Sequence, residues 1–228
     1  MYDTTSLSMK FIIAAFVASI ATLAIAQPEQ DLRDSQKFPS KWSSVDSLDL
    51  PKYTGGWYET LSSRGVREEM ERGCTCSQSY YKLNETKPDV IDVTNACRRF
   101  GRVYEIKGEA RRPNATQYPG RLQVKLDVPY RVRRLSRLRN ESDPSVYPEG
   151  NKSNYNILKV YRSENGDYAQ ALVGGENPKY FWLISRTPTI EDQSIYDDAL
   201  ETAECHGYDV DNPHYSDQSQ CTFLISPQ

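Results

Sequence analysis

The stretches Gly55-Gly56-Trp57-Tyr58-Glu59 and Leu183-Ile184-Ser185-Arg186-Thr187-Pro188-Thr189 decide the fold of this chain. The first lies at the start of a predicted β-strand, and the second ends a predicted strand just before a helix. Arg186 can place its guanidinium over the indole of Trp57, a contact that contributes roughly 0.5–2 kcal/mol and covers apolar surface. Such a pair can close one end of a β-barrel. We therefore expect structural roles at the closed end for Gly55, Trp57 and Arg186.

Short alternating runs separated by turn residues fill the region between these two stretches. They predict eight strands, at residues 57–62, 77–83, 90–96, 102–111, 121–128, 155–162, 168–174 and 180–186. No helix-length periodic segment interrupts them, which favours an antiparallel up-and-down meander over a βαβ sheet. An amphipathic helix is expected over residues 190–206, with Thr189 as its cap.

The last predicted strand is apolar on both faces, so both faces must be covered. Trp182 and Ile184 lie on one side, and Phe181 and Leu183 lie on the other. One side can face a barrel lumen, while the other needs the helix as a packing partner. The predicted fold is therefore all-β, an eight-stranded antiparallel barrel with one C-terminal α-helix packed outside.

The N-terminal segment predicts secretion. Lys10 is followed by an apolar run that ends in Ala24-Ile25-Ala26, a small-x-small cleavage site. The run is shorter than the roughly 20 residues that span a bilayer, which favours a signal peptide over a membrane anchor. We expect a signal peptide at residues 1–26, a polar leader at 27–49 and the barrel at 50–228, with a basic loop insertion at 129–153.

Cysteines and sequons agree with a secreted, extracellular protein. Disulfides plus one unpaired thiol are expected among five cysteines: Cys74, Cys76, Cys97, Cys205 and Cys221. The Cys74-Thr75-Cys76 pair is too close for an easy mutual bond, so each member should find a distant partner. Four sequons predict glycosylation at Asn84, Asn114, Asn140 and Asn151. The two histidines lack the spacing of zinc ligands, so we predict no metal and no cofactor.

Charge is distributed unevenly along the chain. The net charge of −3 gives no general attraction to nucleic acid, and no such partner is expected. The segment Arg131–Arg139, in contrast, carries five arginines in nine residues. It is interpreted as a solvated loop, as a basic lid for an anionic ligand or membrane surface, or as a processing site of furin type.

Several blocks of the sequence resemble the lipocalin family, in the branch of apolipoprotein D, insect bilin-binding proteins and bacterial lipocalins. The blocks are Tyr53–Glu59, Ile106–Ala110, Ala171–Val173, Trp182–Pro188 and Gly207–Val210. The resemblance runs from about Tyr53 to Cys221. It implies a Cys76–Cys221 bond to the C-terminal tail and a second Cys74–Cys97 bond. Cys205 then remains a free thiol, which leaves a monomer or a covalent dimer open.

The resemblance also implies a function. It predicts a secreted carrier that binds a small hydrophobic ligand, such as a fatty acid, sterol, retinoid or bilin, in the barrel cavity. The expected ligand contacts, which are otherwise plain barrel core, are Tyr81, Asn95, Tyr104, Ile106, Leu122, Val124, Tyr155 and Trp182.

Two other classes of function compete with this prediction. Some lipocalin-like proteins are enzymes, but no histidine falls in a predicted strand to activate a nucleophile. Glu59 is the one acidic residue of interest, and we predict no catalytic residue and no enzyme. The other class is a secreted interaction or defence protein that acts through its loops.

Overall fold

The structure is a computed structural model that describes residues 43–138 and 142–225 of the 228-residue chain. The predicted signal peptide, most of the leader, Arg139 and Asn140 lie outside the described residues. None of the helices within these two ranges has the length and hydropathy of a membrane span.

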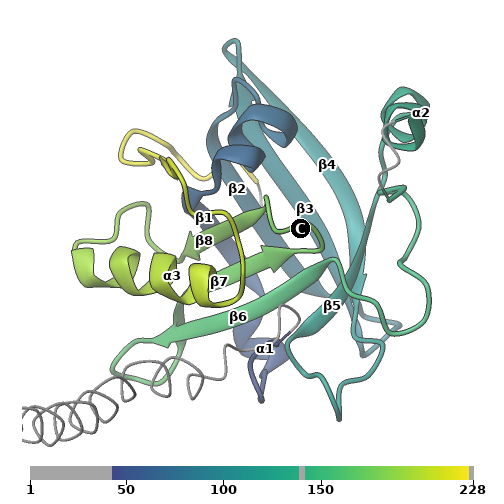
Figure 1. The fold of residues 1–228 in the computed structure, drawn as a ribbon, viewed down its shortest axis with the longest axis horizontal. Helices are drawn as coiled ribbons and strands as arrows, with labels where there is room; N and C mark the ends of the chain where they lie inside the picture. The colour runs from purple at the N-terminus through teal and green to yellow at the C-terminus, as the bar shows by residue number, and fades with distance from the viewer. Residues whose placement is uncertain (1–42, 139–141, 226–228) are drawn as a thin grey trace, which may run out of the picture. The chain divides into compact units, whose positions relative to one another are not determined.

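In the described residues, nine strands form one antiparallel sheet, and eight of them close into a barrel (Figure 1). Each barrel strand pairs with the next in sequence, and β1 pairs with both β2 and β8, which closes the ring. This confirms the predicted fold class. The barrel strands are β1 (Gly55–Ser62), β2 (Thr75–Leu83), β3 (Val90–Arg99), β4 (Arg102–Arg111), β5 (Arg121–Leu126), β6 (Tyr155–Arg162), β7 (Tyr168–Gly175) and β8 (Phe181–Ser185).

The outer helix α3 (Gln193–Cys205) lies beside β6, β7 and β8 (Figure 1). The prediction that Thr189 caps it is wrong. Asp192 is the N-cap, because its carboxylate accepts the amide hydrogen of Ser194 at 3.0 Å. Cys205, at the end of α3, is a half-buried free thiol.

Strand β8 is covered on both faces, as its sequence predicts. Ile184 belongs to the core inside the barrel, and Trp182 packs against that core. Phe181 and Leu183 are fully buried in a second core with Ala199 and Ala203 of α3 and with Tyr208, which follows the helix.

Two short helices cover parts of the barrel. Helix α1 (Leu50–Tyr53) precedes β1 and buries Leu50 and Tyr53 in the interior core. Leu48, from the segment assigned to the leader, is also buried in this core. The π-helix η1 (Val66–Met70) lies in the β1–β2 connection, where Val66 is fully buried.

The chain after α3 fills a gap between β1 and β2. These strands pair only over Gly55–Tyr58 of β1 and then part. The short strand β9 (His214–Tyr215) pairs with the free end of β1. Gln218 then donates from Nε2 to the carbonyl oxygens of Glu59, at 2.8 Å, and Ser77, at 2.9 Å. One amide side chain therefore joins the two separated strands.

Two disulfides connect the start of β2 to other parts of the fold. The structure bonds Cys76 of β2 to Cys221 of the tail, across 145 residues of sequence. It bonds Cys74 to Cys97 of β3, across 23 residues. These are the pairs that the sequence analysis expects.

The inserted segment differs from the prediction of a loop. Helix α2 (Tyr130–Leu138) forms within it, because this stretch is rich in Arg and Leu, which favour helices. Strand β5 also ends at Leu126, two residues earlier than expected, and the Leu126 amide donates to the Pro144 carbonyl oxygen of the insertion at 2.7 Å. The Gln123 side chain holds the end of the insertion in place. Its Nε2 lies within 2.7–3.1 Å of three backbone carbonyl oxygens of the insertion.

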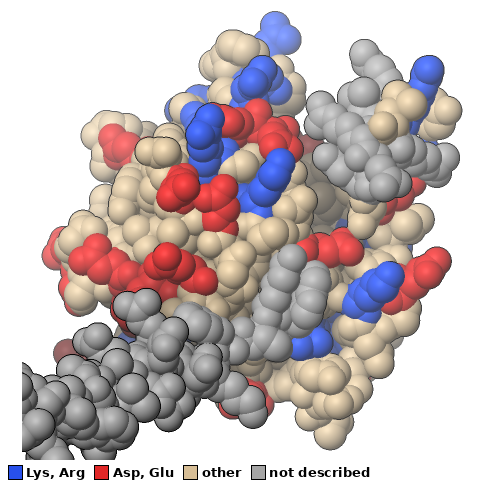
Figure 2. Space-filling model, viewed as in Figure 1, with Lys and Arg blue, Asp and Glu red and all other residues tan. Residues whose placement is uncertain are grey.

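Charged side chains are distributed in separate areas of the surface. Figure 2 shows acidic side chains over α3 and basic side chains near the tip of the β3–β4 hairpin. The cavity inside the barrel, in contrast, is lined by uncharged side chains.

Candidate functional site

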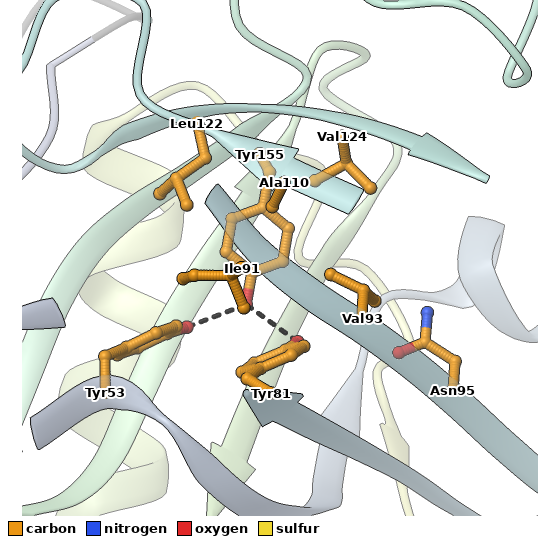
Figure 3. A pocket seen from close by; sticks show the side chains of 9 residues that line it. All are labelled: Tyr53, Tyr81, Ile91, Val93, Asn95, Ala110, Leu122, Val124 and Tyr155. Carbon is orange, nitrogen blue, oxygen red and sulfur yellow. Dashed lines mark hydrogen bonds between the residues drawn. The ribbon is translucent and has the colours of Figure 1, made fainter. Parts of the chain in front are cut away.

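A cavity lies inside the barrel among the side chains of the interior core (Figure 3). Its volume is about 50 Å³. Its walls are Tyr53, Tyr81, Ile91, Val93, Asn95, Ala110, Leu122, Val124 and Tyr155. None of these side chains carries a charge at neutral pH. Within residues 43–138 and 142–225, no group of three or more His, Cys, Asp or Glu residues is placed to hold a metal ion.

Most of the predicted ligand contacts lie at this cavity. Strand alternation brings five of the eight to its walls: Tyr81, Asn95, Leu122, Val124 and Tyr155. They come from four strands, β2, β3, β5 and β6. The cavity is therefore assembled only when the barrel closes.

Three predicted contacts do not line the cavity. Tyr104 is 51% exposed, because β4 extends beyond the level at which β5 still pairs with it. Ile106 lies on the same part of β4 and is half-buried. Trp182 packs against the interior core without reaching the cavity.

Four lining residues were missed by the sequence analysis. Ile91 and Val93 share the period-two face of β3 with Asn95, and Ala110 shares the face of β4 with Ile106, so alternation could have found these three. Tyr53 lies in α1, before the first strand, and no strand pattern points to it.

Three tyrosine hydroxyl groups meet in the cavity wall (Figure 3). The Tyr155 hydroxyl lies 2.7 Å from that of Tyr53 and 3.1 Å from that of Tyr81. Burial raises the pKa of all three phenols, and those of Tyr53 and Tyr155 lie well above the usual value. The cluster is therefore neutral at physiological pH and can both donate and accept hydrogen bonds.

At the closed end of the barrel, next to the cavity, two aromatic rings and one guanidinium pack together. The Tyr53 ring lies 5.3 Å from the fully buried Trp57 ring, and Arg186 Cζ lies 3.6 Å from the centre of that ring. Arg186 also donates to the carbonyl oxygens of Lys52, Thr54 and Gly56 at 2.7–2.9 Å. The predicted contact between Trp57 and Arg186 is present.

A family model described as a lipocalin-like domain matches residues 48–218 of this chain. The chain belongs to the lipocalin family. This lipocalin is 29% identical to temperature-induced lipocalin-1 of Arabidopsis thaliana over 176 residues, which cover 77% of this chain and 82% of the relative. It is 24% identical to the outer membrane lipoprotein Blc of Vibrio cholerae over 180 residues, or 79% and 88% of the two chains.

The fold of this lipocalin is also similar to that of solved structures. Insecticyanin from the tobacco hornworm Manduca sexta has a TM-score of 0.52 and 17% sequence identity, over 80% of this chain and 88% of that chain. At this identity the similarity concerns the fold alone.

The lipocalin also contains a buried acidic residue at the gap between β1 and β2. Glu59 is 5% exposed and accepts a hydrogen bond from Ser216 of the tail at 3.2 Å. Burial, followed by the neighbouring carboxyl group of Glu71, raises the pKa of Glu59 well above its usual value. Glu71 in turn accepts a hydrogen bond from Ser77 at 2.6 Å. The environment of Glu59 therefore favours its protonated form.

This burial predicts a pH-dependent stability. The pKa of Glu59 is higher in the folded than in the unfolded state. The stability that this difference gives to the folded state is therefore fully present below the unfolded pKa of about 4.5, and it is lost as pH rises towards the folded pKa. We expect Glu59→Gln to remove this loss. The difference in unfolding free energy between variant and wild type should then increase in favour of the variant as pH rises from 4.5, measured by urea unfolding.

Glu105→Gln, at an exposed position on β4, is the matched control and should leave the pH profile unchanged. Parallel profiles for wild type and Glu59→Gln would show that Glu59 binds no extra proton in the folded state.

Proposed function

We propose that this lipocalin is a secreted carrier that binds a small hydrophobic ligand in the barrel cavity. The observation that carries this proposal is the cavity itself, an uncharged and mostly apolar space enclosed by a continuous antiparallel ring. Binding sites for small molecules have this character, with apolar walls and a few polar groups that orient the ligand. Membership of the lipocalin family supports the same function.

The size of the cavity favours a slim ligand. Its volume of about 50 Å³ is well below the roughly 300–1,000 Å³ of typical ligand pockets, so a slim ligand requires the smallest rearrangement of its walls. An alkyl chain or a narrow ring system suits this space better than a tetrapyrrole does. The nine lining residues include no His, Cys, Lys, Asp or Glu, and burial raises the pKa of the three tyrosines further above neutrality, so we propose binding without catalysis.

Three features support secretion. The apolar N-terminal run ends in the cleavage pattern Ala24-Ile25-Ala26. Four of the five cysteines form disulfides, which persist in oxidising compartments. Asn151, a predicted glycosylation site, is exposed, and a glycan there would point into solvent.

The carrier function predicts that filling the cavity abolishes binding. Ala110 is 4% exposed and lines the cavity, so Ala110→Phe would place a ring where the ligand binds. With full-length protein collected from the culture medium, we expect fatty alcohols, fatty acids, sterols or retinoids to quench tryptophan fluorescence saturably. Ala110→Phe should raise the dissociation constant of the best ligand at least about tenfold, equivalent to about 1.4 kcal/mol.

Val103→Phe is the matched control, since Val103 is exposed on the outer face of the same strand. It should leave affinity unchanged, and both variants should retain the wild-type circular dichroism spectrum. Mass spectrometry of organic extracts from the native protein would identify the carried molecule. Equal affinities of Ala110→Phe and wild type would place the ligand elsewhere.

A second function is favoured by the exposed side chains of α2. Tyr130 is 66% exposed and Leu138 is 73% exposed, beside the exposed Arg134. An apolar and basic helix of this kind suits contact with an anionic membrane surface through Tyr130, Arg134 and Leu138. If no compound of the panel quenches saturably and the protein sediments with anionic vesicles, this interaction function would replace the carrier function.

A further inference from the structure

The Asn95 side chain has a polar atom without a partner in the cavity wall. Its Oδ1 has an accessible area below 1 Å² and no hydrogen-bond partner within the described ranges. A buried polar atom without a partner is unfavourable, and such groups in proteins are usually satisfied by another group, a water or a ligand. Figure 3 shows the amide at one end of the cavity, beyond Val93.

The amide can present either end to a ligand. Asn95 lies on β3, whose backbone is fixed by pairing with β2 and β4. The terminal torsion of asparagine is broad and roughly two-fold, so a rotation exchanges Oδ1 and Nδ2. A ligand group that both donates and accepts hydrogen bonds therefore fits Asn95 in either orientation.

The tyrosine cluster offers one further hydrogen-bond donor. Three hydroxyl groups carry three hydrogens, and the two bonds that join them use two. The remaining hydrogen is available to an acceptor in the cavity. At two places, then, the walls present polar groups to a ligand that is otherwise surrounded by apolar side chains.

A charged ligand does not suit this cavity. None of its nine lining residues is a lysine, arginine or histidine. The guanidinium of Arg186 lies over the Trp57 ring, and three backbone carbonyl oxygens already accept its Nη hydrogens. A carboxylate would lose its hydration and gain no cationic partner, which strongly disfavours its binding.

We propose that the cavity selects a neutral apolar molecule that carries a hydroxyl group, and that Asn95 hydrogen-bonds this hydroxyl. The inference rests on the proposed carrier function and names the chemical class of its ligand. Asn95 acts here as a specificity-determining residue, because removing its amide would leave an apolar cavity without a preference for hydroxyl groups.

Three probes that differ only in their head group test this proposal. Decanol, decyl chloride and decanoate each contain ten carbon atoms and differ at the first of them, and competition against a fluorescent fatty alcohol at neutral pH gives their affinities. We expect decanol to bind about tenfold more tightly than decyl chloride, as one additional hydrogen bond to a buried group provides. Decanoate should bind more weakly than decanol.

Asn95→Leu replaces the amide with an apolar group of similar shape. It should reduce the preference for decanol over decyl chloride to about one, while decyl chloride binds at least as well as to wild type. Thr94→Val, on the opposite face of the same strand, should keep the wild-type preference. The ranking of the three probes on wild type tests the proposal even if Asn95→Leu fails to fold.

The outcomes separate the two proposals. If neither the three probes nor any compound of the wider panel of fatty alcohols, fatty acids, sterols and retinoids binds saturably, the carrier function fails. If decyl chloride or decanoate binds as tightly as decanol, or Asn95→Leu keeps the preference, the hydroxyl inference is overturned while the carrier function stands.

Discussion

Trp57→Ala should lower the free energy of unfolding by about 3–5 kcal/mol, as for other large buried aromatic residues. The Trp57 side chain is fully buried, and its indole Nε1 donates to the Tyr53 carbonyl oxygen at 3.0 Å. Alanine would leave a cavity between Tyr53 and Arg186 and would remove the ring that the guanidinium covers. Urea unfolding followed by far-UV circular dichroism measures this loss.

Trp57 and Arg186 should contribute to the free energy of unfolding as one unit. Arg186→Ala removes the contact with Trp57 and the hydrogen bonds to three backbone carbonyl oxygens. Because the two side chains touch, the loss in the double variant should be smaller than the sum of the single losses, by about 0.5–2 kcal/mol.

An exposed aromatic residue provides the control. Tyr104→Ala, at a half-exposed position on β4, should change stability by less than about 1 kcal/mol. Additive losses for Trp57→Ala and Arg186→Ala would show that their contact contributes nothing to stability.

Replacing both Cys76 and Cys221 with serine should destabilise the fold by about 3–5 kcal/mol. The bond closes a loop of 145 residues, for which the loss of chain entropy in the unfolded state corresponds to about 5 kcal/mol. Removing it also frees the segment that carries Gln218, and with it the link between Glu59 and Ser77. Urea unfolding under non-reducing conditions measures the difference.

The second disulfide provides a matched comparison. Cys74–Cys97 closes only 23 residues, so replacing both of its cysteines with serine should cost about 1.5 kcal/mol less in the same entropy model. Cys205→Ser, which removes a free thiol, should leave stability nearly unchanged. A larger loss for the short loop than for the long one would contradict the chain-entropy account.

The barrel was predictable because its strands follow a simple alternation. In β8, Trp182 and Ile184 face the interior core and Phe181 and Leu183 face α3, as the sequence pattern requires. Alternation assigns a side chain to a face, but it does not say how far along the barrel that face stays enclosed. Tyr104 has the right parity and is nevertheless half-exposed, because β4 extends beyond its pairing with β5.

The parts of the site that could not be predicted depend on contacts between distant segments. Tyr53 enters the cavity wall from a four-residue helix, and its hydroxyl meets that of Tyr155, 102 residues later in the chain. The orphan Oδ1 of Asn95 likewise becomes visible only when every neighbouring donor and acceptor has been placed. Helix α2 differs from the expectation because a run of arginines is compatible both with a solvated loop and with a helix, which arginine favours.

The tail that bridges β1 and β2 has a consequence for biosynthesis. Ribosomes make β1 before every other barrel strand, whereas Gln218 and Cys221 emerge only after all eight have been translated. Until then, the end of β1 beyond Tyr58 exposes unpaired amide and carbonyl groups, which can pair with another nascent chain. The late arrival of this segment makes the growing chain prone to intermolecular pairing until translation has passed Cys221.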